Sequence, residues 1–425
     1  MSVLTLQLGQ CGNQLGEAMF DTWAEELERA RPDMAEALEQ CYFSRSRGGK
    51  LRANAVLVDM EPKVVQGLLG AGQRRAWGYD ETKAVWRQGG SANNWAYGFN
   101  GHGPQVAEEV WEAVRRSVEP LDRLGGVVAL QSVAGGTGSG LGAFVTGQVR
   151  ELLPKAPVVA ACVWPFETGE VGVQAYNAAL SLTAAYEVAD AVVLLENEQH
   201  AQLCAATLGV GRPSFDAINR AMATGLGHLG LPCRAGRGRG LGAPWVSHLR
   251  HLAAHPALRM LVCASLPQVP VASADFTAET WAALTARGGR MLDRGSIVDD
   301  HKTRVAHSTA TVCAATVFLR GSRPGEAPLD ALQRPGRFWG AAVDPLQVHL
   351  DQHQYQGNFR SLGLAVNSQA CLHPLDAVAC KATAMWRSRA YVHQYEEYGI
   401  SVEDLAEVVV GVEVIRSSYA TLGRE

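Results

Sequence analysis

Apolar residues gather in short runs along the first half of the chain, and stretches of helical periodicity separate these runs. Over 106–118 a valine recurs at every fourth position, which predicts a helix with one buried face. The apolar runs have the length of buried strands and lie at 3–8, 55–59, 127–133, 158–164 and 191–195. Strands that alternate with helices are typical of a parallel sheet covered on both faces, so this half predicts an α/β fold.

The second half begins after a glycine- and arginine-rich segment at 234–240, which we interpret as a connecting loop. One short run of this composition is weak support for nucleic-acid binding. Strand-like runs follow at 260–266, 311–319 and 363–367, and two stretches with apolar residues at helical spacing end the chain. The pattern therefore predicts a second unit with its own sheet, followed by two helices.

A glycine-rich segment directly follows one of the predicted strands. Its sequence, AGGTGSG at 134–140, comes after the run at 127–133, and a helix continues from Leu141. Glycines let the backbone turn sharply and approach a ligand closely. The amides of the first helical turn, with the helix dipole behind them, bind anions, and the natural anion is a nucleotide phosphate. Loops at Gly9, Asp59 and 164–170 also follow strands, so all of them should meet at one edge of the sheet.

Two other nucleotide-binding patterns fit this segment less well. A P-loop needs a lysine at the helix start, and none follows Gly138 or Gly140. A dinucleotide pattern can be traced through Gly138, Gly140 and Ala143, but the next strand does not end in a suitable acid. A nicotinamide-dependent enzyme therefore stays open only as a remote alternative.

Composition excludes several classes of function. Charged residues make up 19% of the chain and the net charge is -4, so no strong field toward nucleic acid or an anionic membrane is expected. No apolar run is long enough for a transmembrane helix, and the N-terminus has no basic region typical of a secretory signal. The 9 cysteines form no C-x-x-C pair and are interpreted as reduced thiols.

Several segments resemble the tubulin family, and the match runs from residue 2 to about 420. AGGTGSG is similar to the family signature. Three segments resemble the family's nucleotide loops: GQCGNQ at 9–14, DMEP at 59–62 and NNWAYG at 93–98. ENE at 196–198 resembles its base-binding strand end. Features most like the delta class are VDMEPKV at 58–64, WP at 164–165 with TGEV at 168–171, and YVHQY at 391–395.

This resemblance implies a three-layer α/β fold. It places a parallel-sheet GTPase domain with its connecting core helix at 1–235, an intermediate domain with a mixed sheet at 236–368, and a C-terminal helical hairpin at 369–425. It implies a structural GTP-binding protein of the cytoplasm and cytoskeleton, located at centrosomes, centrioles and ciliary basal bodies. There it would form or stabilise triplet microtubules in ciliogenesis. The expected partners are alpha-, beta- and epsilon-tubulins and centriolar proteins, with no nucleic acid or membrane.

An alpha- or beta-like, polymer-forming GTPase is the main alternative. Those tubulins continue into an acidic tail, whereas this sequence ends at Glu425 without one, so no tail-dependent partners are expected. In alpha-tubulin a glutamate reaches the neighbouring subunit's nucleotide. When the sequences are aligned through His255 and Pro256, Ser247 occupies the position of this glutamate. Serine cannot act as a carboxylate base. The resemblance thus implies no catalytic residue in this chain and little or no autonomous GTPase activity.

The resemblance also assigns the residues that would bind GTP or GDP. Asn197 and Asn219 would pair with guanine, because a carboxamide offers both donors and an acceptor, and Phe215 would stack on the base. Glu170 and Gln174 fall on the ribose side, where they differ from the acidic pair of polymer-forming tubulins. The full set is Gly9, Gln10, Cys11, Gln14, Asn93, Ser132, Gly135, Gly136, Thr137, Gly138, Glu170, Gln174, Asn197, Phe215, Ile218 and Asn219.

Three smaller predictions complete the candidate chemistry. Asp59 and Glu61 follow a strand, and Mg²⁺ prefers carboxylates together with phosphate and water oxygens, so we expect them to hold Mg²⁺ through water. Cys11 sits at a helix start, where the dipole lowers a thiol pKa, but by resemblance it packs against the nucleotide. Histidines at 248, 251 and 255 are spaced for one helix face; because no cysteine or carboxylate completes the set, we assign no metal there.

Overall fold

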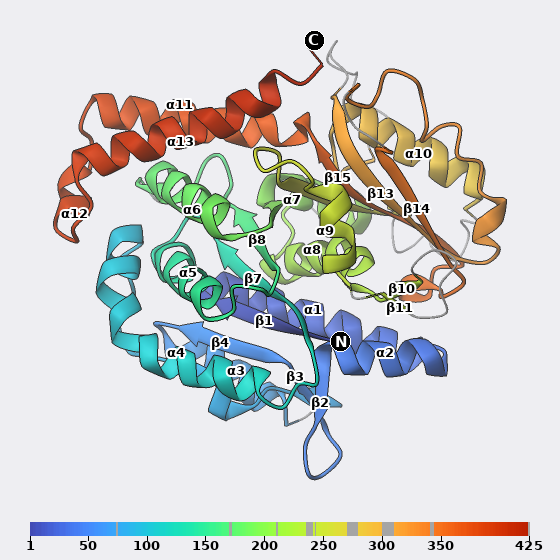
Figure 1. Cartoon of the computed structure of the whole chain (residues 1–425), viewed down its shortest axis with the longest axis horizontal. Coiled ribbons are helices and arrows are strands. Elements are labelled where there is room, and N and C mark those ends of the chain that lie inside the picture. Colours follow the sequence, from blue (N-terminus) through green and yellow to red (C-terminus); the bar gives the residue numbers. More distant parts are fainter. Residues whose placement is uncertain are drawn as a thin grey trace. The chain divides into compact units, whose positions relative to one another are not determined.

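The computed structural model describes residues 1–73, 75–169, 172–209, 211–234, 241–242, 244–269, 279–299, 310–340 and 344–423 (Figure 1). The chain divides into two compact units. The first contains Met1–Phe20, Glu39–Val192 and His373–Ser417, and the second contains Asp21–Leu38, Val193–Leu372 and Ser418–Glu425. The units thus alternate along the chain, and the three consecutive domains proposed from the sequence stay a prediction.

The first unit is built on a parallel sheet. Its strands lie in the order β8 (Val158–Trp164), β7 (Leu124–Ser132), β1 (Ser2–Leu8), β4 (Ala55–Asp59) and β6 (Ala84–Trp86). All residues of β4 and β8 are buried, as expected for valine-rich strands covered on both faces. The α/β class and the strands expected in this unit are confirmed. The short edge strand β6 was missed.

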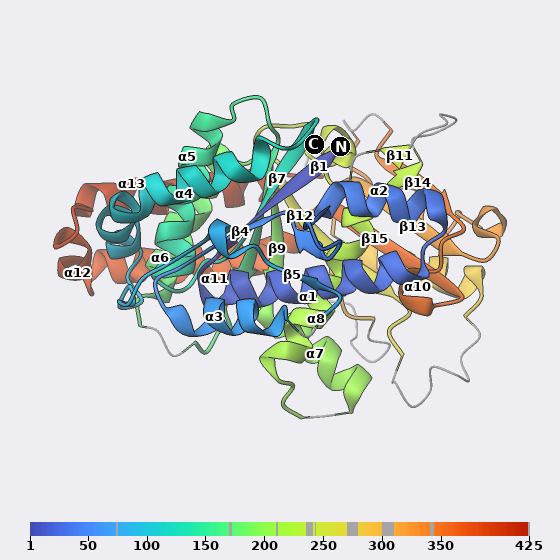
Figure 2. The same ribbon diagram turned by 90° about the horizontal axis from the view of Figure 1, so that it is seen from below.

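Helices cover both faces of this sheet. Figure 2 shows α4 (Gly103–Val118) and α5 (Gly142–Leu152) on one face, and α3 (Pro62–Ala71) with the start of α1 (Gly9–Arg29) on the other. The predicted helix at 106–118 is confirmed by α4, whose Val106, Val110 and Val114 are buried. The remaining elements of this unit are α6 (Gln174–Val188), the C-terminal α11 (Leu372–Arg387), α12 (Val392–Glu396) and α13 (Val402–Ala420), and a small sheet of β2 (Phe43–Arg45), β3 (Leu51–Ala53) and β5 (Trp77–Gly78).

The second unit has a mixed sheet. β15 (Arg360–Ser368) lies between antiparallel neighbours β12 (Met260–Leu266) and β13 (Val312–Gly321), and β14 (Leu346–Asp351) runs parallel to β13. Trp281, Leu284, Met291 and Leu292 of α10 (Trp281–Arg294) belong to the apolar core that this sheet forms. The predicted strands are confirmed, and β14 was missed because its residues are mostly half-buried and carry no apolar run.

Further short elements complete the second unit. These are α2 (Pro32–Tyr42), β9 (Ala191–Glu196), α7 (Asn197–Leu208), α8 (Phe215–Gly230), β10 (Cys233–Arg234), β11 (Leu241–Gly242) and α9 (Val246–Leu252); the division between the units falls inside α2 and β9. The predicted connecting loop lies outside the described residues over 235–240. No helix of the described part is long and apolar enough to cross a membrane.

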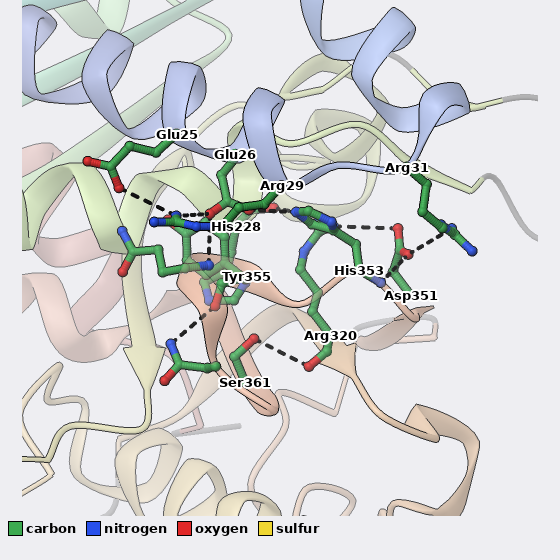
Figure 3. A network of polar contacts seen from close by, with 12 residues as sticks. Glu25, Glu26, Arg29, Arg31, His228, Arg320, Asp351, His353, Tyr355 and Ser361 are labelled. Atoms are coloured by element: carbon green, nitrogen blue, oxygen red, sulfur yellow. Dashed lines mark hydrogen bonds and ion pairs between the residues drawn. The ribbon is translucent and has the colours of Figure 1, made fainter. Parts of the chain in front are cut away.

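A network of buried polar side chains lies within the second unit (Figure 3). Glu26, on the later turns of α1, is fully buried. Its carboxylate lies 2.5 Å from His353 Nε2 and accepts a hydrogen bond from Gln356 N at 2.8 Å. Arg320, at the end of β13, lies 3.6 Å from Asp351 of β14 and is also buried. Because buried polar groups need partners, these contacts fix the segment after β14 against α1.

Candidate nucleotide site

The loop after β1 meets the glycine-rich loop after β7 at close range. Gly9 has φ +72°, a conformation that residues with a side chain rarely adopt, and a Cβ there would lie 2.7 Å from Gly138 N. The Asn13 side chain donates to Gly9 O at 2.9 Å and to Val58 O at 3.3 Å, which ties this loop to the end of β4. The ends of three neighbouring parallel strands therefore come together, as the sequence predicts.

The segment 91–98 closes on the glycine-rich loop. Ser91 Oγ lies 2.8 Å from Thr137 Oγ1. A Cβ at Gly136 would lie 2.5 Å from Ser91 Cβ, and one at Gly98 would lie 2.2 Å from Gly136 O. The following helix opens with a π-helical turn at Thr137–Leu141 and continues as α5. Glycine is thus required at these positions by close packing.

Asp59 places a buried carboxylate at the same edge of the sheet. It ends β4, is 2% exposed, and its Oδ1 accepts hydrogen bonds from Met60 N at 2.8 Å and Glu61 N at 3.4 Å. Burial raises the pKa of Asp59 to about 6, against the lowering effect of these two hydrogen bonds. Its Oδ2 makes no hydrogen bond within the described part of the chain. A buried, unpartnered carboxylate oxygen suits a hard cation, which would also relieve the cost of the buried charge.

The second predicted magnesium residue, Glu61, is exposed and lies beside the loop that leads to Ser91. A Cβ at Gly90 would lie 3.0 Å from Glu61 Oε1, and Gly89 N donates to Met60 O at 3.0 Å. The loops after β4 and β6 are therefore in contact. Glu61 thus lies beside the loop that leads to Ser91, and Ser91 contacts Thr137 of the glycine-rich loop, which is consistent with the predicted Mg²⁺ site.

For Cys11, burial opposes the effect of the helix start and raises the pKa of the thiol to about 12. The packing role stays a prediction. Of its neighbours on α1, Gln10 is exposed and Gln14 is half-buried. Ser132 ends β7, and its Oγ accepts a hydrogen bond from Ala134 N at 3.2 Å.

On the expected ribose side, only part of the prediction can be placed. Gln174 begins α6, and its Nε2 donates to Phe166 O at 3.0 Å, which holds α6 to the segment after β8. Glu170 lies outside the described residues. Sequence reasoning missed Asn177, one turn further along α6, whose side chain bonds to two of the phosphate-side loops. The sequence did offer one signal, because Asn177 lies one helical turn after Gln174, a residue already assigned to the site.

The residues assigned to the base belong to the second unit. Asn197 begins α7, and Phe215, Ile218 and Asn219 occupy one face of the first turns of α8. Phe215 is 61% exposed, while Ile218 and Asn219 are buried. The two helices pack against each other. An exposed aromatic ring beside amide side chains is the chemistry that a base needs, so this half of the site stays a consistent prediction.

The histidines near Ser247 do not share one helix face, contrary to expectation. Helix α9 ends at Leu252, so His255 lies beyond it. His248 is 1% exposed and its Nε2 lies 3.3 Å from Cys233 Sγ, whereas His251 Nε2 lies 3.2 Å from Ala315 O. Ser247 itself is exposed. The prediction erred because it extended helical spacing beyond the end of the helix.

Comparison with known proteins agrees with this geometry. Residues 2–205 match the Tubulin/FtsZ family, GTPase domain. The tubulin delta chain of Canis lupus familiaris is 34% identical, with 99% of this chain and 100% of the relative covered, and that of Mus musculus is 33% identical with 100% of both covered. The tubulin beta chain of Porphyra purpurea is 26% identical, with 95% of this chain and 89% of the relative covered. The chain therefore belongs to the tubulin family of cytoskeletal GTP-binding proteins, and it is more similar to these delta chains than to this beta chain.

Proposed function

We propose that this protein is a structural tubulin that binds GTP or GDP together with Mg²⁺ at the edge formed by β7, β1 and β4. The observation that carries the proposal is the close meeting of their loops. Gly9, Gly98 and Gly136 have no room for a Cβ, and the unpartnered oxygen of Asp59 lies buried at the same edge. Backbone amides at helix starts would bind the phosphates, and bound Mg²⁺ would neutralise phosphate charge.

The finer function follows from the similarity to delta chains. We infer a role at centrioles and ciliary basal bodies, where this protein forms or stabilises triplet microtubules and so supports ciliogenesis. Its partners there are other tubulins, namely alpha, beta and epsilon, and centriolar proteins. An exposed serine at 247 in place of the glutamate expected from alpha-tubulin supports a structural role with little GTP turnover of its own.

The first test is the choice of nucleotide, because the base half of the site rests on Asn197 and Asn219. In calorimetric titrations with Mg²⁺, purified protein should bind GTP or GDP at least about tenfold more tightly than ATP, a difference of only about 1.4 kcal/mol. Asn197→Ala should reduce this preference more than it weakens phosphate binding. Gln202→Ala, an exposed change one turn further along α7 and outside the ENE segment, is the matched control and should leave the preference unchanged.

Two outcomes would contradict the proposal. Equal affinity for GTP and ATP would remove the base assignment. Preferential binding of a nicotinamide dinucleotide would favour the remote alternative of a nicotinamide-dependent enzyme.

A further inference from the structure

Asn177 is a buried residue of the first unit whose side chain makes four hydrogen bonds. Its side chain is fully buried, and its Nδ2 donates to Asn93 O and Ala134 O, both at 2.7 Å. Its Oδ1 accepts hydrogen bonds from Trp95 N at 3.0 Å and from the Tyr395 hydroxyl at 2.7 Å. A carboxamide has two donor hydrogens and an oxygen with two lone pairs. All four are used, so the orientation of this side chain is fully determined.

One of these bonds holds backbone that would otherwise be unfavourable. Ala92 and Asn93 have φ +47° and +55°, a region that residues with a side chain rarely adopt. Such residues persist where the surrounding structure holds them in place. Asn177 holds the Asn93 carbonyl and, at the same time, the start of the glycine-rich loop at Ala134. It therefore sets the positions of two phosphate-side loops relative to each other.

The fourth bond reaches the C-terminal helices. Tyr395, on α12, is fully buried, and its ring packs edge-to-face on Tyr176 of α6 with centroids 5.4 Å apart. Tyr395 is thus held in position by packing, and its hydroxyl is directed at Asn177. The hydroxyl of Tyr176 is also buried, but it makes no hydrogen bond within the described residues.

The same C-terminal segment contacts the segment 91–98 and the π-helical turn Tyr97–His102 at further points. Asn94 Nδ2 donates to Gln394 O and Asn100 Nδ2 donates to Tyr398 O, both at 2.7 Å. The segment therefore packs along the loop that carries Asn93. A movement of α12 would reach this loop both directly and through Asn177.

We propose that Asn177 is a positioning residue for the phosphate loops and that Tyr395 couples it to the C-terminal helices. The inference rests on the proposed nucleotide function and extends it to regulation. A partner that binds these helices and withdraws the Tyr395 hydroxyl lowers nucleotide affinity. By reciprocity, bound nucleotide strengthens the docking of α12 to the same degree.

Tyr395→Phe tests the coupling, because it removes one hydroxyl and keeps the packed ring. Tyr176→Phe is the matched control, since it removes a neighbouring buried hydroxyl that has no hydrogen-bond partner in the described part of the chain. In nucleotide-free, full-length protein, Tyr395→Phe should speed amide hydrogen exchange over 91–98 and 134–138 by roughly three- to tenfold, the range that one lost hydrogen bond gives. Release of N-methylanthraniloyl-GDP should accelerate by a similar factor.

The control separates positioning from general stability. Tyr176→Phe should leave both rates within about twofold of wild type, and thermal unfolding of the two variants is recorded in parallel. Unchanged loop exchange in Tyr395→Phe, or equal effects of both variants, would overturn the coupling, whatever happens to the unfolding temperature. If loop exchange rises as expected but the wild type binds no guanine nucleotide, the coupling stands and the proposed function fails.

Discussion

At the scale of single residues, Asp59 keeps a carboxylate where burial opposes its charge. Its pKa of about 6 exceeds the value of about 3.9 in an unfolded chain. Between these two pH values the folded state binds the proton more tightly, so this group stabilises the fold less and less as pH rises from about 4 to 7. The loss reaches about 3 kcal/mol. We therefore expect Asp59→Asn to raise the urea midpoint of nucleotide-free protein in EDTA at pH 7.5, with a smaller gain near pH 5.

Glu61→Gln is the control for this prediction, because it removes an exposed carboxylate two residues away. Its urea midpoint should stay close to that of wild type across the same pH range, because the charge of Glu61 is the smallest of the effects on the pKa of Asp59. Parallel pH profiles for wild type and Asp59→Asn would show that burial does not disfavour the Asp59 charge. The raised pKa could not have been predicted from the sequence, since DMEP gives the spacing of the two carboxylates but not the exposure of either.

At the scale of elements, the part of α1 within the second unit is anchored by Glu26. Removal of this carboxylate in Glu26→Ala leaves Gln356 N and His353 without their buried partner, so we expect a loss of about 3–5 kcal/mol in the free energy of unfolding. Glu25→Ala is the matched control, because Glu25 is 59% exposed and pairs with Arg29 on the surface. It should cost less than about 1 kcal/mol in the same urea titration. Similar losses in both variants would contradict the anchoring role.

The contact between Glu26 and His353 also shows which features of the fold cannot be predicted from the sequence. Strands such as 55–59 and 158–164 could be predicted, because a buried parallel strand requires a continuous apolar run. Glu26 and His353 are 327 residues apart, and glutamate is almost never fully buried unless it is paired. Nothing local to either residue indicates the other. The half-buried strand β14, which precedes His353, gave equally little signal.

At the scale of the whole molecule, the phosphate-side loops and the C-terminal helices that contact them all belong to the first unit. The loops of the first unit could be predicted to meet, because the carboxyl ends of parallel strands share one edge. Asn177 and Tyr395 could not be assigned in the same way, since their link depends on the C-terminal segment returning to the first unit across 218 residues of sequence. The motifs thus located the phosphate side, and the chain topology supplied the residues that position it.

The last prediction concerns turnover between molecules. Self-assembly on the expected face would bring Ser247, not a glutamate, to the neighbouring γ-phosphate, and a missing general base typically costs about 10²–10⁴-fold in rate. The neighbouring His248 is a poor substitute, because it is buried and burial lowers its pKa to about 3. We therefore expect wild-type protein to hold GTP with negligible phosphate release. Ser247→Glu should raise phosphate release in proportion to subunit contact, so the specific activity of this variant should grow with protein concentration. Ser247→Gln is the control, because its side chain has a similar size without the carboxylate, and it should stay inactive. Robust, concentration-dependent hydrolysis by the wild type would refute the assignment of Ser247, and its loss in His248→Ala would transfer the role to the histidine.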